Sequence, residues 1–160
     1  MTTNTIGMSS KIKGKFSKIL VAIDGSQPSM EAAEYAIEMA KKDTAQIIAL
    51  TVNRIPLSSY GLATPEGELK SSQEKEIILE YKERLANLEQ IAKQHNVELK
   101  TEIVNSQMSI DGTIVEYAES ADVDLIIMGT RGRSGFKKLL LGSTASAVAT
   151  YSPCPVMIVK

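Results

Sequence analysis

The sequence predicts an α/β fold: an open five-stranded, mostly parallel sheet with helices on both faces. Five short apolar runs alternate with segments whose apolar residues recur at helical spacing, in the order β-α-β-α-β-α-β-α-β. Strands that alternate with helices need crossover connections, which are right-handed and place the strands parallel. A chain of 160 residues without an internal repeat or linker suits one domain with a sizeable core. We expect a single domain over residues 17–160, preceded by a flexible extension over residues 1–16.

The first strand and helix are expected near the start of this domain. The run from Lys18 to Ile23 is apolar on both faces, as a central parallel strand requires. The turn Asp24-Gly25-Ser26 ends it, and Pro28 follows in the first turn of a helix, where the missing N–H costs little. Apolar residues from Ala33 to Ala40 lie on one face of that helix. A second buried strand is expected from Gln46 to Val52.

The middle of the chain predicts a long loop, a long helix and an edge strand. Residues 53–72 carry prolines and glycines with few apolar residues, and so long a loop is usually functional or mobile. An apolar stripe from Ile78 to Ala92 then marks a helix ending near Asn96. From Val97 to Ile103 apolar and polar residues alternate, which suits a strand at the edge of the sheet.

The last third completes the alternation. A helix should begin near Ser109 or Asp111, and the apolar run from Asp124 to Met128 reads as a buried parallel strand. A glycine-bearing loop, a helix of small residues from Thr144 to Tyr151 and a final strand from Val156 to Val159 follow.

The glycine-bearing loop is the strongest functional signal. Gly129 follows the fourth strand, Gly132 comes three residues later, and Gly142 stands with Ser143 at the start of the last helix. Glycine allows sharp turns and lets a ligand approach the main chain, and a helix start presents free N–H groups where the helix dipole favours anions. We expect a phosphate cradle in which the amides of Gly142, Ser143 and Thr144 donate, with the Ser143 hydroxyl as a further donor.

Other residues near the carboxyl ends of the strands are candidates for the same site. Arg131 and Arg133 can neutralise phosphate charge, although cations on loops are also often simply solvated. Asp24 can accept from a ribose hydroxyl or hold a Mg²⁺ that bridges phosphates; alternatively it bonds backbone N–H groups of its own turn. Val52 either flanks a purine, with its main chain on the adenine edge, or only packs in the core.

Composition and missing motifs exclude several function classes. With 18 basic and 19 acidic residues the net charge is −1, which gives no reason to expect nucleic acid or an anionic membrane as partner. One cysteine and one histidine exclude a disulfide framework and a Cys/His zinc site. Neither the dinucleotide fingerprint nor a P-loop occurs. No apolar stretch reaches the roughly 20 residues that span a bilayer and no signal peptide is visible, so we expect a cytoplasmic protein.

The glycine spacing resembles the G-x2-G-x9-G-[S/T] signature of the ATP-binding branch of the universal stress protein (UspA-like) family. The likeness runs from Ser17 to Lys160 and includes the segments Ile19–Ser26, Asp124–Gly129 and Ser152–Val156. It implies a Rossmann-like sheet of order 3-2-1-4-5. It also implies a homodimer formed through the final strand, where a short apolar edge invites a partner strand.

The resemblance also assigns site roles. Asp24 aligns with the acidic residue near the ribose and metal, and Val52 with the adenine contact. Arg131 stands where a histidine is often found, which leaves its side-chain role open. The full set of expected nucleotide-binding residues is Ala22, Asp24, Val52, Met128, Gly129, Arg131, Gly132, Arg133, Gly142, Ser143 and Thr144.

The glycine-bearing loop and the family resemblance together predict an ATP-binding protein, and the resemblance implies a stress-response role as a nucleotide-dependent switch or sensor, with AMP or ADP as open alternatives to ATP. A second hypothesis is slow ATP hydrolysis, in which Asp24 and a Mg²⁺ position water and Arg131 or Arg133 stabilises developing charge. It ranks lower because no dedicated general base is visible, and no catalytic residue is assigned. A third is a nucleotide-independent dimeric interaction module whose glycines only shape a turn.

Overall fold

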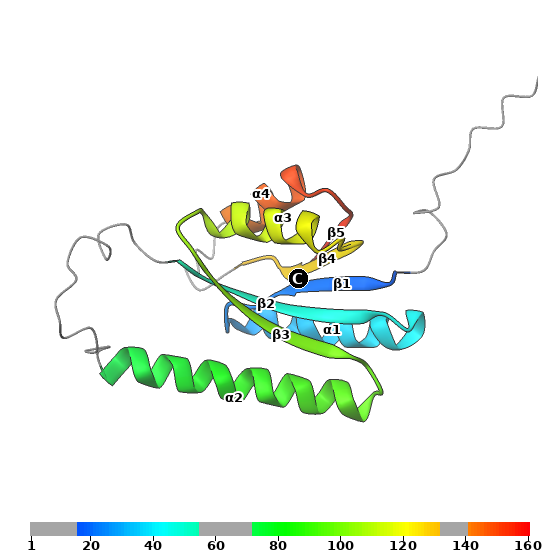
Figure 1. Ribbon diagram of the computed structural model, residues 1–160, viewed down its shortest axis with the longest axis horizontal. Helices are drawn as coiled ribbons and strands as arrows, with labels where there is room; N and C mark the ends of the chain where they lie inside the picture. The colour runs from blue at the N-terminus through cyan, green and yellow to red at the C-terminus, as the bar shows by residue number, and fades with distance from the viewer. Residues whose placement is uncertain (1–15, 55–71, 132–140) are drawn as a thin grey trace, which may run out of the picture.

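A parallel five-stranded sheet forms the middle layer of the protein (Figure 1). The computed structural model describes residues 16–54, 72–131 and 141–160. The strands are β1 (Lys18–Ala22), β2 (Gln46–Arg54), β3 (Leu99–Ser106), β4 (Leu125–Gly129) and β5 (Val156–Val159). They lie in the order β3-β2-β1-β4-β5, and all neighbours are parallel. The predicted fold class and strand order are confirmed. Residues 1–15 of the expected N-terminal extension and most of the expected 53–72 loop lie outside the described residues. Phe16, the last residue assigned to that extension, instead packs against the core, and its N–H donates to the Asp43 carboxylate at 3.2 Å.

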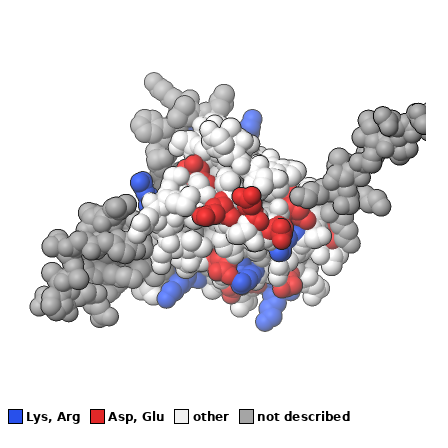
Figure 2. Space-filling model, turned by 45° about the horizontal axis from the view of Figure 1, so that its top comes forward, with Lys and Arg blue, Asp and Glu red and all other residues white. Residues whose placement is uncertain are grey.

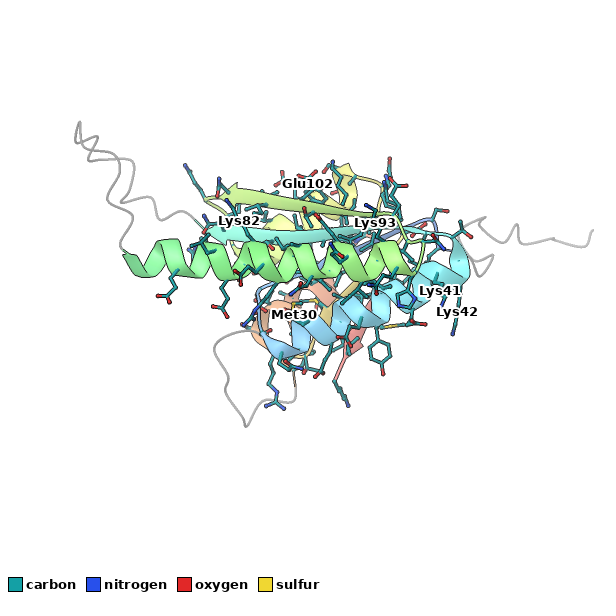
Figure 3. All side chains as sticks on the ribbon, turned by 90° about the horizontal axis from the view of Figure 1, so that it is seen from below. Met30, Lys41, Lys42, Lys82, Lys93 and Glu102 are labelled. Carbon is teal, nitrogen blue, oxygen red and sulfur yellow. The ribbon has the colours of Figure 1, made fainter. Side chains whose placement is uncertain are left out.

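Helices cover both faces of this sheet. They are α1 (Gln27–Asp43), α2 (Ser72–Gln94), α3 (Ile110–Ser120) and α4 (Ser143–Tyr151). Helices α1 and α2 lie side by side on one face, and α3 and α4 cover the other (Figures 1 and 3). None of the helices in the described part of the chain combines the length and apolar character needed to cross a membrane.

Two hydrophobic cores sit on either side of the sheet. In β1, Ile19 and Val21 face α1 and α2, whereas Leu20 between them faces α3 and α4, and all three are fully buried. This burial on both faces explains why β1 is apolar throughout its length. Charged side chains stay outside: on the face in Figure 2, acidic residues gather near the centre and basic residues lie around them.

The boundaries of several elements differ from those predicted because their partners set them. β2 continues two residues past Val52, since Asn53 and Arg54 pair with β3 and the Asn53 amide donates to the Asn105 side chain at 3.0 Å. Val97 precedes β3, and its N–H donates to the carbonyl of Ala92 at 2.9 Å, which closes the end of α2. Pro28 lies in the first turn of α1, as predicted, and the predicted starts of α3 and α4 are correct to within one residue.

Candidate functional site

A pocket opens where the strand order reverses. β1 leads into α1 on one face of the sheet, and its neighbour β4 leads toward α4 on the other. In such sheets ligands bind in the crevice beyond the carboxyl ends of the strands at this switch point. The pocket there has a volume of about 370 Å³.

Every predicted site residue that the structure describes lines this pocket. These residues are Ala22, Asp24, Val52, Met128, Gly129, Arg131, Gly142, Ser143 and Thr144. The other two, Gly132 and Arg133, lie outside the described residues. Segments far apart in the sequence thus meet around one cavity.

One part of the pocket is apolar. Val52 and Leu50 come from β2, Met128 from β4, and Ile110 and Ile114 from α3. Leu50, Met128 and Ile114 are buried, whereas Ile110 is 41% exposed and stands at the rim. This arrangement suits an apolar group of a ligand.

The main chain of Val52 faces an open position next to this apolar wall. The Ile47 N–H donates to the Glu98 carbonyl, and the Leu50 carbonyl accepts from the Ile23 N–H. Odd residues of β2 therefore direct their main chain toward β3 and even residues toward β1. β1 ends at Ala22, opposite Leu50, so the N–H and C=O of Val52 point past the end of β1.

The other part of the pocket is polar and includes the start of α4. Gly142 is the N-cap and supplies no side-chain acceptor to the helix. The N–H groups of Ser143 and Thr144 belong to the first turn, where an α-helix offers them no internal partner. Those two amides and the helix dipole favour an anion at this position.

Gly142 has a different role from the one predicted. Its N–H donates to the Thr130 carbonyl at 2.7 Å, so the predicted donation from Gly142 to a phosphate is wrong. A Cβ at this position would lie 3.1 Å from the same carbonyl oxygen. Glycine therefore allows the two ends of the loop to close on each other, and the amides of Ser143 and Thr144 are left for a ligand.

Gly129 is also explained by packing rather than by a turn or a ligand. It is the last residue of β4 and pairs with Val159 of β5. A Cβ would lie 2.7 Å from the Pro28 Cβ and 2.8 Å from the Pro28 carbonyl oxygen. The missing side chain thus admits the first turn of α1 against the end of β4.

The Asp24 carboxylate is fixed by its own turn. Its Oδ1 accepts the Ser26 N–H at 2.9 Å and the Ser26 hydroxyl, so the alternative interpretation as a turn residue is confirmed. Gly25 between them has φ +79°, a conformation that favours glycine. The described residues contain no cluster of three or more His, Cys, Asp or Glu side chains for a metal. A cation beside Asp24 would therefore take most of its ligands from phosphates and water.

Sequence reasoning missed the contribution of α2. Tyr81 falls within the apolar stripe predicted for that helix, but it lines the pocket and its hydroxyl donates to the Asp24 carbonyl. Arg84, one turn along the same face, donates to the Gly25 carbonyl. A charged residue beside an apolar stripe was the available signal, although it does not identify the partner.

Comparison with known proteins supports the assignment of the fold. A model described as the universal stress protein family matches residues 15–160. The chain is 37% identical over 147 residues to universal stress protein MJ0531 of Methanocaldococcus jannaschii, covering 91% of this chain and 82% of the relative. It is 34% identical over 153 residues to universal stress protein YxiE of Bacillus subtilis, covering 91% and 99%.

Solved structures share the architecture. The universal stress protein UspA from Lactobacillus plantarum superposes with a TM-score of 0.77 at 26% identity, covering 91% of this chain and 99% of that one. The Archaeoglobus fulgidus universal stress protein in complex with dAMP gives a TM-score of 0.62 at 21% identity, covering 91% and 98%. The latter identity shows the common fold alone. With the family match spanning the whole described domain, this chain belongs to the universal stress protein family.

Proposed function

We propose that the protein binds an adenine nucleotide, and specifically ATP, in the pocket between β1 and β4. The observation that carries this proposal is the union, in one pocket of about 370 Å³, of an apolar wall and the exposed amides of α4. A nucleotide has the same two ends: a flat base and an anionic tail. The dAMP complex of the Archaeoglobus fulgidus protein agrees with this assignment, but the support comes from the pocket of this chain.

The base belongs in the apolar part, between Val52 and Ile110. The N–H and C=O of Val52 point past the end of β1 and offer one donor and one acceptor side by side. Adenine presents the complementary pair, the N1 acceptor and the N6 donor. In the same orientation, guanine presents a donor at N1 and an acceptor at O6, so its edge would face like groups and leave them unpaired.

The phosphates belong at the start of α4. The amides of Ser143 and Thr144 donate there, with Arg131 exposed at the same side of the pocket. Asp24 faces the ribose and, with Mg²⁺, the phosphates. Binding or release of the nucleotide would then change the polar surface around Asp24 and the start of α4. We infer that the protein acts through this change as a switch or sensor in the stress response.

Replacing Ser143 by proline tests the phosphate site without disturbing the helix. Ser143 is the first residue of α4, where proline fits, and Gly142 has φ −67° and ψ 159°, the conformation required before proline. Ser143→Pro removes one amide donor, whereas the control Ser143→Ala removes only the hydroxyl. Because hydrogen bonds to charged groups are the strong ones, we expect Ser143→Pro to weaken ATP and AMP binding at least about tenfold.

Adenosine provides the second control in this experiment. It lacks phosphate, so its affinity, measured by titration calorimetry, should be the same in the wild type, Ser143→Ala and Ser143→Pro. Equal ATP affinity in wild type and Ser143→Pro would remove the phosphate site from the start of α4. Absence of any nucleotide binding by the wild type would favour the interaction-module alternative.

A further inference from the structure

We propose that Tyr81 and Arg84 of α2 are positioning residues for the nucleotide site. They hold the Asp24–Gly25 turn against α2, and thereby couple the docking of this helix to the occupancy of the pocket. This inference rests on the proposed function. It gives α2 a role beyond lining the pocket, which is to position the Asp24–Gly25 turn.

Three contacts from one face of α2 converge on this turn. The Tyr81 hydroxyl donates to the Asp24 carbonyl, and the Arg84 guanidinium donates to the Gly25 carbonyl. The Tyr81 ring lies over Gly25, since a Cβ there would be 3.3 Å from the ring carbon that carries the hydroxyl. Two consecutive carbonyls of the turn are therefore held by one helix.

The Arg84 contact is itself held in place. The other terminal nitrogen of the guanidinium pairs with the Glu80 carboxylate at 2.5 Å, one turn back along α2. A guanidinium that is bound through two nitrogens has less conformational freedom than one bound through a single nitrogen, so less entropy is lost when it donates to a further acceptor. Arg84 thus presents a defined donor to the Gly25 carbonyl.

These bonds fix the part of the turn that the Asp24 side chain cannot fix by itself. The carboxylate binds forward to Ser26, but Gly25 at φ +79° is the flexible link between the two residues. The hydrogen bonds to the carbonyls of Asp24 and Gly25 prevent the two peptide groups on either side of Gly25 from rotating. The carboxylate then keeps its place on the pocket wall.

Coupling between α2 and the pocket follows from thermodynamic linkage. If free protein lacking these bonds populates turns with a displaced carboxylate, the apparent dissociation constant rises by the inverse of the competent fraction. Reciprocally, a nucleotide bound at Asp24 must strengthen the docking of α2 by the same factor. Tyr81 is the point of contact, because it belongs to α2 and also lines the pocket.

Conservative variants test this coupling in the full chain. Tyr81→Phe removes one hydroxyl and Arg84→Met removes one donor group, and both keep most of the side-chain volume. The matched controls are Tyr35→Phe on α1 and Lys82→Met on α2, both at exposed positions; Figure 3 labels Lys82. We expect each test variant to bind ATP about three- to tenfold more weakly, and each control to bind as the wild type does.

Amide hydrogen exchange separates positioning from simple stabilisation. In the wild type, ATP should slow exchange in α2 from Tyr81 to Gln94, and this effect should shrink in Tyr81→Phe and Arg84→Met. Arg84→Lys, which keeps a cationic donor, should recover part of both the affinity and the protection. A purely structural role would lower the melting temperature while leaving ATP-induced protection of α2 unchanged.

The outcomes distinguish this inference from the proposed function. If the wild type binds ATP and both test variants match its affinity and α2 protection, the coupling is overturned while the nucleotide site stands. If the wild type binds no nucleotide, both fail. Should Arg84→Met not fold, Tyr81→Phe, which removes a single oxygen atom, decides the question.

Discussion

At position 129, the first turn of α1 leaves no room for a side chain. The pocket position of Gly129 favours a ligand-related explanation, yet the nearest atoms belong to Pro28 and include backbone. Backbone atoms cannot move away as the end of a flexible side chain can. The constraint therefore acts on the folded protein whether or not a nucleotide is bound.

We expect Gly129→Ala to lower the free energy of unfolding by about 1–3 kcal/mol in the absence of nucleotide, as overpacking of a core does. Urea denaturation followed by circular dichroism measures it. The control is Ser146→Ala on the exposed side of α4, which should change stability by no more than about 0.5 kcal/mol. An unchanged unfolding free energy in Gly129→Ala would show that α1 can shift away from β4.

Asp24 combines a structural and a proposed ligand role, and asparagine separates them. Asp24→Asn keeps the Oδ1 that accepts from Ser26 and removes the charge. We expect about tenfold weaker ATP binding with Mg²⁺ present, the size of a lost charged interaction, and a smaller dependence of the affinity on Mg²⁺ than in the wild type. Titrations with Mg²⁺ and with a chelator measure both quantities.

Asp122→Asn is the matched control for this change, because Asp122 is exposed and lies just before the amino end of β4, away from the pocket. Asparagine also tolerates the φ of 52° found there. If Asp24→Asn kept a Mg²⁺-dependent affinity equal to that of the wild type, the carboxylate would have no part in holding the cation.

At the scale of elements, the sequence predicts what is decided locally. Apolar runs predict the strands, and apolar residues at helical spacing or a run of small residues predict the helices. The site residues Asp24 and Ser143 come directly after or before such elements. Boundaries differ where a neighbour decides them. β2 reaches Arg54 because β3 runs beside it as far as Ser106, and this pairing cannot be read from either strand alone.

Long-range contacts explain what the sequence could not supply at the site. The Tyr81 hydroxyl donates to the Asp24 carbonyl, 57 residues away in the sequence. The Gly142 N–H donates to the carbonyl of Thr130, at the other end of the glycine-bearing loop. Both contacts depend on how helices settle on the sheet. A pattern of residue types does not contain that geometry. Gly129 and Gly142 therefore line the pocket as predicted, but their roles there differ from the predicted ones.

At the scale of the whole molecule, the pocket lies where the two cores of the protein meet. Tyr81 and Ser29 reach it from the α1 and α2 side, and Ile114 and Ala145 from the α3 and α4 side. A ligand that contacts both sides binds only the folded protein and therefore raises its free energy of unfolding. At roughly 100 times its dissociation constant, such a ligand stabilises the protein by about 2.7 kcal/mol.

The edge of β5 gives the molecule a second place for assembly, and here we propose the homodimer. The Pro155 carbonyl accepts from Ile126 of β4 and the Val159 carbonyl from Thr130 just after β4. Because successive residues of a strand alternate in direction, the main-chain groups of Val156 and Ile158 face away from the sheet. This short apolar edge can add a strand from a second copy. The amide of Ile158 would donate across that interface.

Ile158→Pro should therefore yield a monomer, whereas Ile158→Ala should remain a dimer. Both variants lose the packing of the isoleucine side chain against the core beneath α3 and α4, but only proline removes the outward N–H, and proline is tolerated on an edge strand when that N–H faces outward. Size-exclusion chromatography with light scattering gives the mass of each, and circular dichroism verifies that both fold. A dimeric Ile158→Pro would count against main-chain pairing at the outer edge of β5, because only the Val156 N–H of the two outward-facing donors would remain there.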